Sequence, residues 1–174
     1  MKHNFNHLIA GYWAGVYSQA ERVDLEDAVF SAITPYMFIS CCDAKDEPRF
    51  IAAGSQVRNT LGAVVGKSFF SLFSAADRPL IRKLFLLCWE KNEPICFTAT
   101  ADLAPDKYCE IEISIFPIRQ RDDQSDCYMG LFVPLQDITD EFLSLPLKVI
   151  MSEEVSNVLT SEGATIVPFR GRSA

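Results

Sequence analysis

Few side chains in this sequence have the types and spacing that could support chemistry. Among 174 residues there are two histidines and six cysteines. His3 and His7 are four residues apart, so on a helix they share one face and have the spacing of a metal-binding pair. Zinc sites use at least three protein ligands, and no third ligand follows nearby. We therefore expect a solvated helix end and no metal site.

The cysteines do not form a recognisable redox or metal motif, because no C-x-x-C pair occurs. Most lie in apolar strand or helix patterns, where a cysteine behaves as a small hydrophobe. Neighbouring residues of a strand point to opposite faces, so adjacent cysteines are poorly placed to pair. The chain also begins without a secretory signal pattern. We expect reduced, inert thiols in a cytoplasmic protein. The six are Cys41, Cys42, Cys88, Cys96, Cys109 and Cys127.

Catalytic constellations are missing as well. There is no serine–histidine or cysteine–histidine arrangement beyond the two N-terminal histidines, and there is no glycine-rich phosphate loop. Glu110 and Glu112 share one face of a predicted strand, which is typical of a solvated outer face. The net charge of −7 disfavours nucleic acids, and no apolar run reaches the ~18 residues of a membrane span. We expect a domain that is not an enzyme.

Two helices are predicted ahead of the first strand, and the first has a strongly aromatic stripe. Apolar residues follow the helical period from Phe5 to Tyr17. Because Trp and Tyr are favoured anchors at interfaces, the stripe is either ordinary core or a homodimer or partner face, and we favour the dimer. The candidate face comprises Phe5, Leu8, Ile9, Tyr12, Trp13 and Val16. A second helix follows Asp24 and stops at Pro35.

A longer helix is predicted from about residue 75 to 92, with Ser74 as its N-cap. Phe85, Leu86 and Trp89 fall away from its inner stripe, so the helix is either buried on two sides or contacts something else. These three residues are a second candidate contact patch. The inner stripe comprises Leu80, Ile81, Leu84, Leu87 and Cys88.

Five strands complete the pattern. The last of them is apolar on both faces and therefore belongs in the middle of a sheet. The order of elements predicts an α+β fold, in which a five-stranded antiparallel sheet carries helices on one face and an N-terminal helical extension. The predicted strands are Met37–Asp43, Arg49–Ala53, Ile95–Leu103, Tyr108–Ile118 and Tyr128–Ile138.

The order of several short motifs resembles a PAS domain across roughly residues 37–139. That region would follow an extension over 1–36 and precede a tail over 140–174. The chain is further similar to a family of bacterial stand-alone PAS proteins, through Tyr12-Trp13 in the first helix and Pro35-Tyr36-Met37-Phe38 at the first strand. The PAS-like motifs are Gly54-Ser55, Gly66-Lys67-Ser68, Ala76-Asp77-Arg78 and the closing Asp137-Ile138-Thr139.

The resemblance implies a sheet of order 2-1-5-4-3 and a pocket between the long helix and the sheet. It also implies a sensory or signalling role, commonly through a homodimer. The tail holds no effector domain, so output would act in trans, and Asp137-Ile138-Thr139 either couples pocket to tail or only caps a turn. The predicted pocket lining, for a small apolar or amphipathic ligand, is Leu80, Leu84, Leu87, Cys88, Phe97, Ile111, Ile113 and Val133. The alternative is a ligand-free interaction module whose pocket is filled by its own side chains.

The resemblance offers no support for a cofactor. Haem-bearing PAS domains use a histidine on the long helix, where this chain has none and only Cys88 could ligate. Flavin-bearing light sensors use a cysteine in an Asn-Cys-Arg-Phe type motif on a short helix, where this chain reads Gln56-Val57-Arg58-Asn59. We therefore expect neither haem nor flavin.

Overall fold

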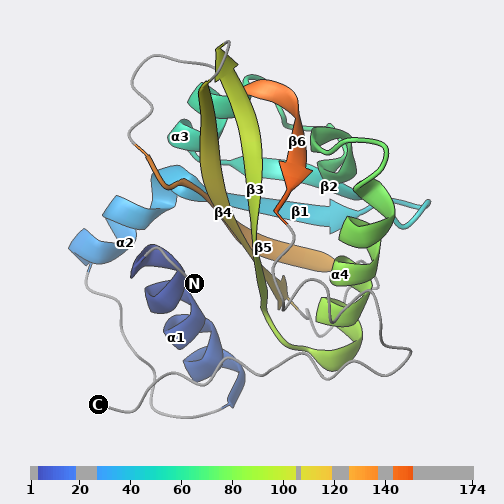
Figure 1. The fold of residues 1–174 in the computed structure, drawn as a ribbon. Helices are drawn as coiled ribbons and strands as arrows, with labels where there is room; N and C mark the ends of the chain where they lie inside the picture. The colour runs from blue at the N-terminus through green and yellow to red at the C-terminus, as the bar shows by residue number, and fades with distance from the viewer. Residues whose placement is uncertain (1–3, 19–26, 105–106, 119–125, 137–142, 151–174) are drawn as a thin grey trace.

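The structure is a computed structural model. The main element of the part of the chain that it describes is a twisted antiparallel sheet of six strands (Figure 1). That part comprises residues 4–18, 27–104, 107–118, 126–136 and 143–150. The strand order is β2-β1-β5-β4-β3-β6. The strands are β1 (Met37–Cys42), β2 (Pro48–Ala53), β3 (Ile95–Ala104), β4 (Lys107–Ile118), β5 (Cys127–Pro134) and β6 (Ser144–Val149).

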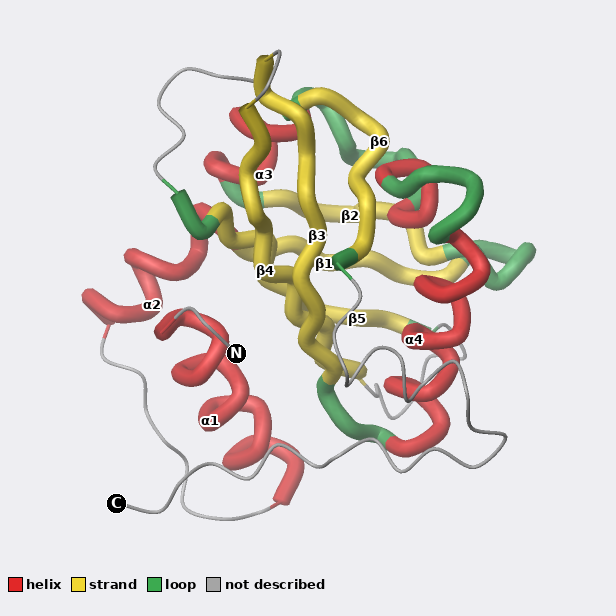
Figure 2. The backbone as a smooth tube through the Cα atoms, viewed as in Figure 1, coloured by secondary structure: helices red, strands yellow, loops and turns green. Residues whose placement is uncertain are grey.

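Helices cover both faces of the sheet (Figure 2). The inner face carries most of the apolar core and is covered by α3, η2 and α4, whereas α1 and α2 pack against the outer face. The two core clusters therefore lie on opposite sides of the sheet. The helical elements are α1 (Asn4–Ser18), α2 (Asp27–Ile33), η1 (Thr34–Tyr36), α3 (Ser55–Leu61), η2 (Phe69–Leu72) and α4 (Arg78–Lys91).

The predicted α+β class and the order 2-1-5-4-3 are confirmed for the first five strands. The strand predicted to be apolar on both faces is β5, which lies between β1 and β4. Phe132 packs into the inner cluster, while Leu131 and Val133 pack into the outer one. Both faces of β5 are thus covered, as the sequence pattern requires.

The sixth strand was not predicted. Residues of β6 pair antiparallel with the free edge of β3, at Ala99 with Val149, Thr100 with Lys148 and Asp102 with Ser144. The sequence here alternates for only a few residues and contains Pro146, which marks an edge strand or an irregular segment. The prediction of five strands is therefore wrong by one, and part of the predicted tail belongs to the sheet.

The long helix begins later than predicted. Ser74 was expected to cap it, but α4 starts at Arg78. The Ser74 hydroxyl donates to the Asp77 carboxylate at 2.7 Å and accepts from the Asp77 backbone N–H at 3.2 Å. These bonds close a separate turn ahead of the helix, so the Ser74 side chain stabilises that turn.

Gly54 joins β2 to α3 at a point where the backbone of η1 passes very close. A Cβ at this position would lie 2.3 Å from the carbonyl oxygens of both Thr34 and Pro35. Backbone oxygens cannot swing aside as a side chain can, so η1 would have to shift. The close approach explains why a glycine stands at this strand-to-helix junction.

We expect Gly54→Ala to lower the free energy of unfolding by roughly 1–3 kcal/mol, the usual cost of overpacking. Urea denaturation would measure it. Gly11→Ala is the matched control, because Gly11 is exposed on α1 and a Cβ there meets nothing within 4 Å. That control should be neutral or stabilising, since alanine favours helix over glycine by about 1 kcal/mol. Equal midpoints for both variants would contradict the close approach.

Candidate functional site

The residues predicted to line a pocket gather on the inner face of the sheet, with one exception. Leu80, Leu84 and Cys88 of α4 are buried in the same cluster as residues of β3 and β4, and Leu87 packs against its border. Val133 lies in the cluster on the opposite face, beside α1. Its assignment to the pocket is wrong, because alternate residues of a strand point to opposite faces and Val133 points to the outer face. The members from the sheet are Phe97, Ile111 and Ile113.

Aromatic rings occupy the inner face at the β1–β2 side of the sheet. The ring of Phe69 lies at the centre, 5.3 Å from Phe38, 5.5 Å from Phe50 and 5.0 Å from Phe85, measured between centroids. Phe85 in turn packs edge-on against Tyr128 at 4.8 Å. These spacings are those of favourable aromatic pairs. The rings form one continuous cluster from β2 to α4, which we call the phenylalanine cluster: Phe38, Phe50, Phe69, Phe85 and Tyr128.

Phe38 covers the middle of the sheet at Gly130 of β5. A Cβ on Gly130 would lie 2.1 Å from the Phe38 ring and 2.7 Å from the backbone oxygen of Ser114. The ring therefore rests directly on the strand backbone, which only a glycine allows. This contact places an aromatic ring of the protein itself against the centre of the inner face.

The polar groups of this interior are held neutral. Burial raises the pKa of the Cys88 thiol and of the Tyr128 phenol well above their usual values. Neither group forms a thiolate or phenolate near neutral pH, so nucleophilic chemistry at Cys88 is disfavoured. The described part of the inner face is therefore lined by apolar side chains, with this thiol and this phenol in their neutral forms.

The outer face is covered by α1 of the same chain. Ile9 is fully buried there, and Phe5, Leu8 and Trp13 pack around it. The Trp13 indole N–H also donates to the carbonyl of Pro117 at 3.0 Å. These residues pack against the chain's own sheet, which is the alternative of ordinary core, and a homodimer through the part of the stripe left exposed stays a prediction. Tyr12 is half-buried, and the side chain of Val16 lies outside the described residues.

Beneath α1 lies a buried carboxylate. Glu112 is 2% exposed, and its Oε2 accepts a hydrogen bond of 2.5 Å from the side-chain amide of Asn6. The prediction of a solvated outer face is therefore wrong at Glu112, whereas Glu110 is only half-buried. The partner stands 106 residues away in sequence, so the pattern of β4 alone could not reveal that a helix covers this position.

The second predicted contact patch is largely internal. Phe85 is buried in the phenylalanine cluster, and the Trp89 ring lies 5.8 Å from that of Tyr128. Only Leu86, which is 56% exposed, points away from the core. The helix α4 is thus buried on two sides, and the reading of these three residues as one partner surface is wrong.

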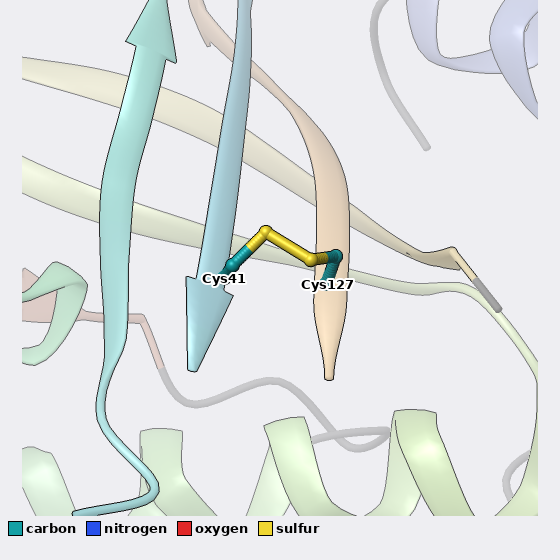
Figure 3. Close-up of a disulfide and its surroundings, with 2 residues drawn as sticks. All are labelled: Cys41 and Cys127. Carbon is teal, nitrogen blue, oxygen red and sulfur yellow. A yellow bond between two sulfur atoms is a disulfide. The ribbon is translucent and has the colours of Figure 1, made fainter. Parts of the chain in front are cut away.

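Two cysteines that were expected to be reduced form a disulfide (Figure 3). Cys41 of β1 and Cys127 of β5 are directly opposite in the strand register, with a Cα–Cα distance of 4.1 Å. Pairing across 86 residues is set by the sheet and could not be read from local spacing. Among the described residues Cys42, Cys88, Cys96 and Cys109 are free.

A family model described as PAS domain matches residues 1–133 of this sequence. The match covers most of the chain and agrees with the sheet order. The chain belongs to the PAS domain family. A search of curated proteins finds no match. One similar solved structure comes from work on a light-oxygen-voltage domain with a flavin analogue, at 16% identity and a TM-score of 0.46, covering 71% of this chain and 89% of that chain.

The PAS match includes α1 and α2, so both helices fall within the family region. Several predicted sites cannot be placed. Asp137-Ile138-Thr139 and His3 lie outside the described residues, while His7 is exposed on α1. Within the described ranges no group of three metal-ligating side chains occurs, and no described helix is long and apolar enough to cross a membrane.

Sequence reasoning missed two parts of this PAS interior. No sequence pattern predicted that the rings of the phenylalanine cluster would meet. The density of phenylalanine, 13 residues in the chain, was the available signal. The buried leucines around β6, Leu143 and Leu147, had no clear signal, because a single proline-containing segment carries them.

Proposed function

We propose that this PAS domain is a signalling module that acts through contacts with other proteins, is not an enzyme, and keeps its inner face filled with its own side chains. The observation that carries the proposal is the Phe38 ring resting on Gly130 within the phenylalanine cluster. A planar cofactor against the centre of the sheet would have to displace that ring. The role in signalling follows from the family, whose members are sensory and signalling modules.

The residues present do not fit the two cofactors considered. The short helix α3 contains no cysteine, and its Val57 points into the apolar core. The long helix α4 contains no histidine. A covalent flavin bond and a histidine-ligated haem therefore lack their protein partners in these elements.

A second candidate is a sensor for a small apolar molecule held between α4 and the β3–β4 strands. It is favoured by the gathering of Leu80, Leu84 and Cys88 opposite Phe97, Ile111 and Ile113, all apolar and in one cluster. Ligand pockets are mostly apolar with few polar groups, which this lining matches. Entry of a ligand here would require the leucines of α4 to move.

Native mass spectrometry of the purified chain separates the two candidates. We expect the mass of the polypeptide alone, no visible absorption band, and no rise in melting temperature with a panel of small apolar metabolites. A ligand retained through purification, or a saturable rise in melting temperature, would favour the sensor and reject the filled interior.

Self-association, a bacterial origin and a cytoplasmic location remain predictions for this PAS chain. Light scattering of the intact protein tests the homodimer, and a monomer at all concentrations would reject it. Trp13→Asp is unsuitable as a dimer-breaking variant, since Trp13 packs against the chain's own sheet and binds Pro117. Its substitution would disturb α1 whether or not a second copy is present.

A further inference from the structure

The strand β6 lies in a groove between the edge of the sheet and the start of α4. On one side it pairs with β3. On the other side the Ser74 backbone N–H donates to the carbonyl of Leu147 at 3.1 Å, and the Val149 N–H donates to the Asp77 carboxylate at 3.4 Å. An extended segment is thus held by its main chain along both edges, which is how proteins hold peptides added to a sheet.

Two leucines anchor this segment in the core. Leu147 is fully buried and Leu143 nearly so, and both belong to the inner cluster. The Leu143 N–H also donates to the carbonyl of Thr60 at 3.1 Å. Between them Leu145 is 45% exposed. The groove therefore selects two apolar side chains four positions apart and tolerates variation between them.

The side chain after the second anchor meets a carboxylate. Lys148 Nζ lies 3.3 Å from Asp102 Oδ2, with both side chains more than half exposed. Such an exposed pair adds little stability, but it favours a basic residue at that position of the segment. The overall charge of −7 favours basic partner segments in the same way.

The attachment of β6 is slight compared with that of its neighbour. Its ladder to β3 is interrupted by a register shift between Thr100 and Asp102, whereas β3 and β4 pair continuously from Ile95 to Asp102. Short edge elements open locally at a lower free energy than central strands. We therefore expect β6 to open locally at a lower free energy than the remaining strands.

We propose that this groove is the docking site for an extended segment of a partner protein, with two apolar residues four positions apart followed by a basic residue, and that β6 occupies it when the partner is absent. The proposal rests on the proposed function, since it names the surface through which the module contacts another protein. A partner segment would replace β6 with the same main-chain bonds and the same two apolar anchors.

Binding of a fluorescent peptide with the sequence of residues 143–150 to the full-length chain tests the proposal. In the Leu147→Ala chain the deeper anchor of β6 is lost, so the groove is vacated more often, and we expect the peptide to bind about tenfold tighter or more than to wild type. Leu145→Ala is the matched control, because Leu145 is exposed in the same strand, and its affinity should equal that of wild type. A peptide carrying Asp in place of Leu147 should not bind.

Hydrogen exchange on the wild-type chain keeps the proposal testable if Leu147→Ala does not fold. We expect the amides of Leu147 and Val149 to exchange through local opening, faster than those of Ile111 and Ile113 in β4. Exchange of β6 only by global unfolding, or no gain in peptide binding by a folded Leu147→Ala chain, would overturn the proposal. A dimer that exchanges β6 between its two copies would also overturn the proposal, because the occupant of the groove would then be a second copy of this chain. The ligand test above is independent, since peptide binding does not depend on whether the interior is filled.

Discussion

Replacing Phe38 by alanine should lower the free energy of unfolding by roughly 3–5 kcal/mol, the range for deleting a buried phenylalanine. Phe38 is almost fully buried, and its ring contacts Phe50 and Phe69 as well as the backbone at Gly130. Neighbouring rings belong to separate elements, β2 and η2, so they cannot all collapse into the space. A cavity at the centre of the inner face should remain.

That cavity gives the prediction a second readout. An apolar cavity of this kind stays dry and binds small aromatic molecules. We expect benzene or indole to raise the melting temperature of Phe38→Ala and to leave that of the wild type unchanged. Urea denaturation supplies the free energy. Phe30→Ala is the control, because Phe30 is 41% exposed in α2, and its cost should stay below about 1 kcal/mol.

A small loss for Phe38→Ala would contradict the filled interior. If the free energy changed as little as in Phe30→Ala, the ring would not be packed as described. If benzene stabilised the wild type as much as the variant, an apolar cavity would already exist beside the rings. Either result would favour the second candidate function, a sensor whose ligand lies between α4 and the β3–β4 strands.

The layering of the sheet was predictable because each strand carries its own signal. The alternation in β3 indicates one covered face, and the continuous apolar run of β5 indicates two. The glycine at position 130 is the one local sign that a ring lies against the backbone of β5. The strand order came through the resemblance to a known family. What the sequence pattern could not supply is which rings meet, since Phe38 and Phe69 are brought together by the crossing from β2 to η2.

The sequence pattern also could not predict what covers the outer face of the sheet. The aromatic stripe of α1 could be buried equally well against its own sheet or against a second copy. The decision depends on Phe116 and Leu131, which lie more than 100 residues further along the chain and form the apolar surface that α1 meets. The Asn6–Glu112 hydrogen bond depends on the same placement. Long-range pairings of this kind have no local signature.

Losing the Cys41–Cys127 disulfide should cost roughly 4.6 kcal/mol of unfolding free energy under oxidising conditions. The bond joins residues 86 apart, and in the chain-entropy model a loop of that size restricts the unfolded chain by about that amount. We expect Cys127→Ser to unfold at lower urea than wild type. Dithiothreitol should bring the wild type down to the variant and leave the variant itself unchanged.

Cys42→Ser is the matched control for that measurement. Cys42 follows Cys41 directly but points to the other face, and burial together with Asp126, Asp46 and Asp43 raises the pKa of its thiol to about 11. It is therefore a poor partner for exchange, and Cys42→Ser should keep the full response to dithiothreitol. If dithiothreitol left the unfolding free energy of the wild type unchanged, that result would contradict the contribution assigned to the disulfide.

Counting the thiols of freshly isolated, denatured protein decides whether the bond forms in the cell. The sequence has six cysteines, so one disulfide leaves four that react. Disulfides persist in oxidising compartments and are rare in the cytosol. Four reactive thiols in protein isolated under a thiol-trapping agent would therefore argue against the predicted cytoplasmic location. Six would favour that location and would mean that β1 and β5 pair in the cell without the disulfide.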